Sequence, residues 1–183
     1  MRALTTIAAA AIGALLLSGC LPQQPIATPP PEATAAPIFA SDEEALAAAT
    51  EAYAAYLAMS DLIAADGGAN PERLELFVTA DQQASASDSF SVYQTKGLRA
   101  EGISTFDAIS LVQVDQGPNF ANIDLYLCLD VSKVRVIDET GSVVTPDNRP
   151  DRLPLEIGFE ADDSVPTELK LARSEPWSGV NFC

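Results

Sequence analysis

The sequence predicts an α+β domain in which N-terminal helices pack against a curved, four-stranded antiparallel sheet. Three observations lead to this fold class. Apolar residues recur at helical spacing from about residue 41 to 96, they alternate with polar residues from about residue 105, and the two patterns do not interleave. Separate runs of helices and strands are typical of an α+β domain with an antiparallel sheet.

A long helix is expected from about residue 42 to Ala65. Ser41 and Glu44 stand three residues apart, which is the spacing of a capping box. The alanine-rich surroundings favour a helical backbone. The residues expected to face the core are Leu46, Ala49, Tyr53, Tyr56, Leu57 and Ile63.

Two further helices are expected before the sheet begins. Asn70 as the N-cap and Pro71 at the first helical position predict the start of one of them. The other covers about residues 81–96 and ends at Gly97, because glycine readily adopts the left-handed backbone of a helix C-cap.

The clearest strand signal lies over residues 123–131. Aliphatic residues occupy the odd-numbered positions, whereas the even-numbered positions hold Asp124, Tyr126, Cys128 and Asp130. The phase of this alternation then changes, which predicts a β-bulge near Ser132 and Lys133. Further strands are expected over 105–116, 153–159 and 169–171.

Residues 1–19 have the pattern of a secretory signal peptide. Arg2 precedes an apolar stretch that ends in small residues directly before Cys20. This ending resembles the signal of bacterial lipoproteins, which implies that Cys20 carries a lipid and starts the mature chain. A plain secretory signal and a transmembrane helix are the alternatives, but the apolar stretch is about half of the ~20 residues that a span requires.

The chain is expected to have three parts: a signal peptide over 1–19, a Pro/Ala/Thr-rich tether over 20–40, and a single α+β domain over 41–183. Prolines favour an extended backbone, so the tether would hold the domain away from the membrane. We therefore expect a protein that is lipid-anchored on the outer face of the cell membrane, as in a Gram-positive envelope.

The composition excludes several kinds of site. The chain has 10 basic and 26 acidic residues, which argues against binding to nucleic acid or to anionic lipid surfaces. It has no histidine, so a Ser-His-Asp triad, a Cys-His pair and a histidine-based zinc site are excluded. Calcium binding is an alternative, although the sequence lacks a D-x-[DN]-x-[DN]-G loop. We expect no metal and no cofactor.

Two cysteines remain if Cys20 carries the lipid. Cys128 and Cys183 allow one intramolecular disulfide, and an exported compartment permits it. A disulfide at Cys183 would also restrain a chain end that otherwise frays. Two unpaired buried thiols are the alternative.

Several short motifs occur in a fixed order after Cys20. They are Gly97-Leu98-Arg99-Ala100-Glu101-Gly102, Cys128-Leu129-Asp130-Val131-Ser132, Asp138-Glu139-Thr140-Gly141 and Trp177-Ser178-Gly179-Val180-Asn181-Phe182-Cys183. In this order they resemble uncharacterised actinobacterial lipoproteins whose domain has the cone-shaped nuclear transport factor 2-like fold. The resemblance implies a sheet wrapped around the long first helix and a Cys128–Cys183 disulfide. It implies no established activity.

The superfamily includes enzymes, such as ketosteroid isomerase-like proteins, that place an acid or a base inside the cone. This resemblance makes Asp124, Tyr126 and Asp130 candidate pocket residues. The strand pattern argues against them, because the aliphatic residues lie on the opposite face. If Asp124, Asp130 and Glu156 all face solvent, the enzymatic hypothesis loses its candidates.

We therefore expect a non-catalytic domain, displayed on the envelope, that binds a small apolar ligand or another envelope protein. The alternative is a small isomerase or hydrolase that acts on an apolar molecule in the cone pocket.

Overall fold

The computed structural model describes residues 36–162 and 164–183. Its elements, in chain order, are α1 (Asp42–Ala65), the 3-10 helix η1 (Pro71–Leu76), α2 (Ala80–Lys96), β1 (Arg99–Glu101), β2 (Thr105–Gln116), β3 (Ala121–Asp130), β4 (Arg135–Ile137), β5 (Arg152–Ala161) and β6 (Leu169–Pro176). Helices and an antiparallel sheet make up the fold, so the predicted α+β class is confirmed.

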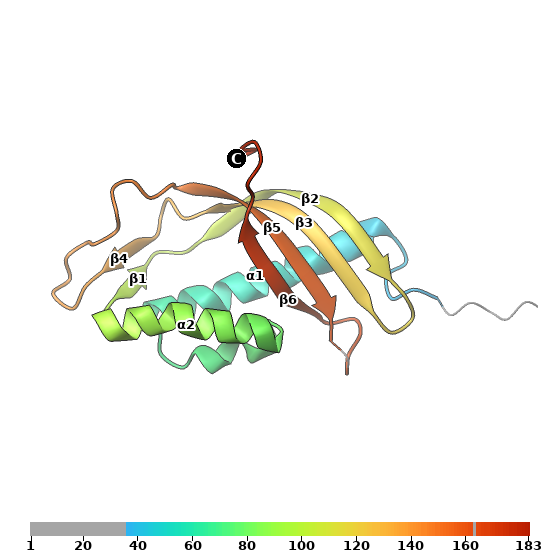
Figure 1. Cartoon of the computed structure of the whole chain (residues 1–183), viewed down its shortest axis with the longest axis horizontal. Helices are drawn as coiled ribbons and strands as arrows, with labels where there is room; N and C mark the ends of the chain where they lie inside the picture. The colour runs from blue at the N-terminus through green and yellow to red at the C-terminus, as the bar shows by residue number, and fades with distance from the viewer. Residues whose placement is uncertain (1–35, 163) are drawn as a thin grey trace, which may run out of the picture. The chain divides into compact units, whose positions relative to one another are not determined.

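The main sheet has four antiparallel strands in the order β2-β3-β5-β6. Figure 1 shows α1 and α2 on one side of this sheet and the C-terminal segment on the other. Two short strands, β1 and β4, pair with each other in a second antiparallel sheet that the sequence analysis did not predict.

The start of α1 follows the predicted capping box. The Ser41 hydroxyl accepts a hydrogen bond from the Glu44 backbone N–H at 3.3 Å, and the Glu44 carboxylate accepts one from the Ala40 N–H at 2.8 Å. The first contact satisfies a donor that a helix start leaves free, and the second bonds the Glu44 side chain to the residue before the N-cap instead of to the N-cap itself. The face that α1 buries carries Ala45, Ala49, Tyr53, Leu57 and Ile63.

The other two helical segments follow the prediction in part. The second is six residues of 3-10 helix, and its N-cap Asn70 has a left-handed backbone with φ 54° and no side-chain capping bond. An N-cap side chain normally needs an extended backbone to reach the free N–H groups. α2 ends as predicted at Gly97, where φ is 61° and a Cβ atom would clash with the Glu139 carboxylate.

The inner face of the sheet packs against α1. Ile123, Leu125 and Leu127 of β3 are fully buried there, as their alternation predicts. Tyr53 of α1 lies edge-on to Phe106 of β2, with ring centroids 4.8 Å apart. We call the opposite face of the sheet the outer face; of β3 it carries Asp124, Tyr126, Cys128 and Asp130.

The predicted bulge near Ser132 and Lys133 is wrong. β3 ends at Asp130, and the chain then turns, with the Val134 N–H donating to the Val131 carbonyl at 2.9 Å. The change of phase therefore marks the passage from the main sheet to β4. The irregularities of the main sheet lie instead within β2 and between β5 and β6, where the register shifts at Gly158.

The folded domain begins before residue 41. The Ile38 N–H donates to the Gly117 carbonyl at 3.2 Å, and the backbone of Phe39 exchanges two hydrogen bonds with the Gln116 side chain. Phe39 is buried, so the end of the predicted tether belongs to the domain because its apolar side chain is part of the core. The predicted signal peptide and Cys20 lie outside the described residues. None of the helices in the described ranges combines the length and the apolar composition of a membrane span.

Candidate functional site

A cleft of about 490 Å³ opens between α1, α2 and the inner face of the sheet. We call it the helix–sheet cleft. Phe90, Val134 and Leu153 contribute apolar surface to it. The polar side chains that reach it include Tyr56, Ser60, Asp61, Ser89, Tyr93 and Arg149. The volume of this cavity lies within the range of small-molecule sites.

Arg149 enters the cleft from the loop between β4 and β5. Its Nη2 donates to the carbonyl oxygens of Val131 at 2.9 Å and Val134 at 2.8 Å. These two bonds hold the planar guanidinium in one orientation. Its Nε is buried, and no described residue accepts a hydrogen bond from it. The arrangement leaves one buried, charged donor without a protein partner.

Two tyrosines supply neutral hydroxyl groups to the cleft. Burial raises the pKa of Tyr56, although a hydrogen bond with Ser60 acts in the opposite direction. Burial also raises the pKa of Tyr93; the Arg149 charge opposes this shift and the Asp61 charge adds to it. Both hydroxyls therefore stay protonated at neutral pH, where each can donate as well as accept.

Asp61 forms part of the wall of the cleft. Its two carboxylate oxygens accept hydrogen bonds from the Ser104 backbone N–H at 2.7 Å and the Ser104 hydroxyl at 2.8 Å. The same two residues also line a neighbouring cavity of about 720 Å³, which we call the apolar groove. Leu62 and Ile103 line this groove and are 55% and 65% exposed. The Asp61–Ser104 contact thus lies between a polar cavity and an apolar one.

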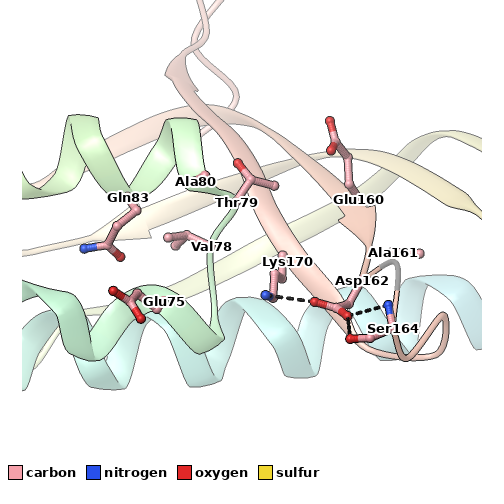
Figure 2. Close-up of a pocket in the computed structure, with 10 residues that line it drawn as sticks. All are labelled: Glu75, Val78, Thr79, Ala80, Gln83, Glu160, Ala161, Asp162, Ser164 and Lys170. Carbon is pink, nitrogen blue, oxygen red and sulfur yellow. Dashed lines mark hydrogen bonds and ion pairs between the residues drawn. The ribbon is translucent and has the colours of Figure 1, made fainter.

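A third cavity, the acidic hollow of about 650 Å³, lies beside η1, α2 and the ends of β5 and β6. Figure 2 shows Lys170 and Ser164 directed toward the carboxylate of Asp162, with Glu75 and Glu160 at its edges. The Lys170 Nζ lies 2.8 Å from that carboxylate. This ion pair and the Ser164 hydrogen bonds hold the pKa of Asp162 well below its usual range. The Lys170 ammonium and the Asp162 carboxylate in the hollow therefore neutralise each other.

No metal site is apparent in the part of the chain that the structure covers. Within residues 36–162 and 164–183, no three or more His, Cys, Asp or Glu side chains come together in a way that could hold a metal ion.

The predicted carboxylate candidates lie on the outer face, away from all three of these cavities. Asp124 accepts a hydrogen bond from Arg173 at 2.7 Å, and Glu156 accepts one from the same guanidinium at 2.6 Å. Asp130 pairs with Arg152 at 3.1 Å. Hydrogen bonds from Ser132, helped by Arg152, lower the pKa of Asp130. These side chains are about a quarter to a third exposed, which agrees with the outward direction that the strand alternation predicts.

Tyr126, the third candidate, packs against the C-terminal segment on the outer face. Its ring centroid lies 4.8 Å from that of Trp177 and 5.8 Å from that of Phe182. Next to it, Cys128 forms a disulfide with Cys183 across a Cα–Cα distance of 5.6 Å. The two cysteines are therefore paired in the structure, and Tyr126 has a packing role there.

Local sequence patterns do not indicate the main residues of the helix–sheet cleft. Asp61, Tyr93 and Arg149 come from α1, α2 and a loop that are far apart in the sequence. The helical spacing predicts a core position for Tyr56, and this side chain packs against the core while partly buried. Arg149 was the one residue with a local signal, because it stands between Asn148 and Pro150 in a chain with few basic residues.

Comparison with known proteins gives structural likeness only. No protein-family model matches the sequence, and no curated protein matches it. The intermembrane space region of the chloroplast protein ARC6 is similar in structure, with a TM-score of 0.51 and 14% identity, over 72% of this chain and 95% of that one. Aln2 from a Streptomyces species gives a TM-score of 0.40 and 17% identity, over 75% of this chain and 93% of that one. The likeness to ARC6 concerns the fold, and a shared fold does not imply a shared function.

Proposed function

We propose that this chain is a bacterial envelope lipoprotein, anchored through a lipid on Cys20, whose domain binds a small ligand in the helix–sheet cleft without transforming it. The observation that carries the ligand-binding part is the cleft itself. It combines aromatic and aliphatic walls with two protonated tyrosine hydroxyls and an orientated guanidinium. We also propose that the domain has the cone-shaped nuclear transport factor 2-like form, with α1 lying across the inner face of the four-stranded sheet.

The anchor part of the proposal is supported by the sequence around Cys20. The apolar stretch and the small residues before this cysteine have the pattern of a lipoprotein signal. Two acyl chains hold a protein stably at a membrane, whereas one is marginal. The proline-rich residues that follow would then separate the domain from the membrane.

Fractionation of bacteria that produce the full chain tests the anchor. The wild-type protein is expected in the membrane fraction, and the Cys20→Ser variant is expected to leave it. If the variant stays with the membrane, the anchor lies elsewhere in the chain. Gln24→Ala is the matched control, since it changes the tether but keeps Cys20 and should not change the fraction.

A pair of substitutions on α2 tests the cleft. Ser89 and Ser91 are both exposed on this helix, but only Ser89 lies at the edge of the cleft. Native mass spectrometry of the full chain, released from its host membrane in mild detergent, should detect a small molecule that co-purifies. Ser89→Phe should abolish this signal because the added ring obstructs the cleft, and Ser91→Phe should keep it. Equal retention in both variants would place the ligand elsewhere and overturn the binding proposal.

An enzymatic role is the second candidate, and one observation favours it. Asp61 places a carboxylate in the wall of the cleft, close to the hydroxyl-bearing residues. A general base needs such a group within hydrogen-bond reach of the proton that it moves. However, both of its oxygens already accept hydrogen bonds from Ser104, which favours a role in holding the wall.

The two roles differ in what happens to the bound molecule. Once mass spectrometry has identified the co-purifying molecule, the full chain is incubated with an excess of it. A binding protein should return the molecule unchanged after many hours. Conversion by the wild type that is lost in Asp61→Asn would support the isomerase or hydrolase hypothesis instead.

A further inference from the structure

We infer that Arg149 is the residue that recognises the ligand of the helix–sheet cleft, and that this ligand is a small organic anion with an apolar or aromatic body. The inference rests on the proposed binding function and adds the chemical class of the ligand. It is carried by the unsatisfied guanidinium donor and by the surroundings of Arg149.

The guanidinium of Arg149 uses Nη2 but not Nε for hydrogen bonds within the described protein. Two backbone carbonyls, those of Val131 and Val134, fix one end of the guanidinium through Nη2. The buried Nε has no acceptor among the described residues. A buried donor without an acceptor is unfavourable, and more so when the group is charged. A carboxylate or sulfonate oxygen in the cleft would pair with the guanidinium charge. It would reach the Nε–H only after a small shift of the side chain, because that atom has almost no exposed surface.

The charge of Arg149 is also uncompensated locally. Arg73, Arg99, Arg152 and Arg173 each lie within 3.3 Å of a carboxylate oxygen. Over the described residues, no carboxylate lies within ion-pair distance of Arg149. Lys96, Lys133 and Arg135 also lack an ion pair among the described residues, but they are exposed to solvent, whereas Arg149 is half-buried. The nearby Asp61 carboxylate is bonded to Ser104 instead.

The other side chains that line the cleft indicate which kind of ligand body would fit. Phe90, Tyr93 and Leu153 offer aromatic and aliphatic surface beside the guanidinium. The formal net charge of −16 repels free anions from the protein as a whole. An anion must therefore gain binding energy from apolar contacts to enter the cleft, so inorganic phosphate or sulfate should bind poorly. This combination selects an amphipathic organic acid.

Two fluorescent probes with the same aromatic body test the inference. Anilinonaphthalene sulfonate carries an anionic group, and phenylnaphthylamine is its neutral counterpart. The full chain should bind the anionic probe more tightly, and Arg149→Met should weaken that binding by about tenfold to a hundredfold, the range of a charge-assisted hydrogen bond. The neutral probe should bind both proteins within about a factor of two. Ser89→Phe should reduce the binding of both probes, which separates the cleft from the apolar groove.

The outcomes distinguish the two proposals. If both probes bind in the cleft but Arg149→Met changes neither affinity, the anionic ligand class is overturned and the cleft remains a binding site. If neither probe responds to Ser89→Phe, both the proposed binding function and this inference are overturned.

Arg149 also bonds to two backbone carbonyls, so Arg149→Met could disturb the fold. A measurement on the unsubstituted chain avoids this difficulty. The Nε–H signal of Arg149 in a proton–nitrogen correlation spectrum is assigned by its loss in Arg149→Lys. Saturating anilinonaphthalene sulfonate should shift this signal, and phenylnaphthylamine should shift it much less. Equal shifts with the two probes would overturn the inference.

Discussion

Asp61 and Ser104, 43 residues apart in the sequence, are joined by two hydrogen bonds of 2.7 and 2.8 Å. This contact connects the last part of α1 to the segment that leads into β2. It also forms a wall shared by the helix–sheet cleft and the apolar groove. One carboxylate therefore contributes to both the stability of the fold and the shape of the proposed site.

Replacing Asp61 with alanine should lower the free energy of unfolding by about 1–3 kcal/mol, because the Ser104 N–H and hydroxyl lose a charged acceptor. Urea unfolding followed by circular dichroism measures this. Glu51→Ala, an exposed position on the same helix, is the control and should change stability by less than about 0.5 kcal/mol. Equal losses in the two variants would show that the Asp61–Ser104 contact has no special weight.

Removing the disulfide should destabilise the domain and release the C-terminal segment. The bridge spans 55 residues, which corresponds to about 4 kcal/mol in the chain-entropy description. In Cys128→Ser/Cys183→Ser, the free energy of unfolding should fall by up to that amount. Trp177 is the only tryptophan of the chain and packs on Tyr126, so its fluorescence reports the segment. A red shift in the folded variant is expected. Unchanged emission would mean that the aromatic contacts alone hold the segment.

Replacing Arg173 with methionine should cost about 0.5–1 kcal/mol, the usual range for partly exposed ion pairs. Asp124 and Glu156 would then face each other without the guanidinium that now bonds to both. Because the remaining repulsion is screened by ions, high salt should recover part of the loss. Thermal unfolding at low and high salt measures this. Arg135→Met, at an exposed site on β4, is the control, and an identical salt response in both variants would contradict the prediction.

The decrease in the free energy of unfolding at low pH should depend on Asp162. Its pKa in the folded chain lies well below the ordinary value of 3.8, chiefly because of Lys170 and Ser164. A lowered pKa stabilises the fold above the ordinary pKa, and this contribution is lost as the pH falls below about 4. Asp162→Asn should therefore be less stable than the wild type at pH 7, and the difference should shrink between about pH 4 and pH 2. Chemical unfolding at a series of pH values measures it, and a difference that stays constant over this range would refute the assignment.

Much of the fold follows from local patterns in the sequence. The capping box at Ser41, the glycine at position 97 and the alternation in β3 each predict a structure that the chain adopts. These signals work because a cap, a left-handed residue and the two faces of a strand depend on neighbours a few residues away. The same alternation placed Asp124 and Asp130 on the face away from α1, where the structure has them.

The change of phase after β3 cannot be interpreted from local sequence patterns alone. Alternation reports which face a residue occupies, but it does not report which strand lies beside it. Val131 to Val134 could form a bulge in one long strand or a turn into another sheet, and only the pairing of β4 with β1 decides between them. That pairing joins residues such as Ala100 and Val136, which are distant in the sequence.

Composition and near neighbours were enough to establish the class of the domain, the absence of histidine chemistry and the direction of the β3 carboxylates. The site, in contrast, depends on packing between distant segments. Asp61, Tyr93 and Arg149 acquire their joint chemistry because α1, α2 and the β4–β5 loop surround one cavity. The unsatisfied Nε of Arg149 exists only because folding buries it beside carbonyls that bind the other end of its guanidinium.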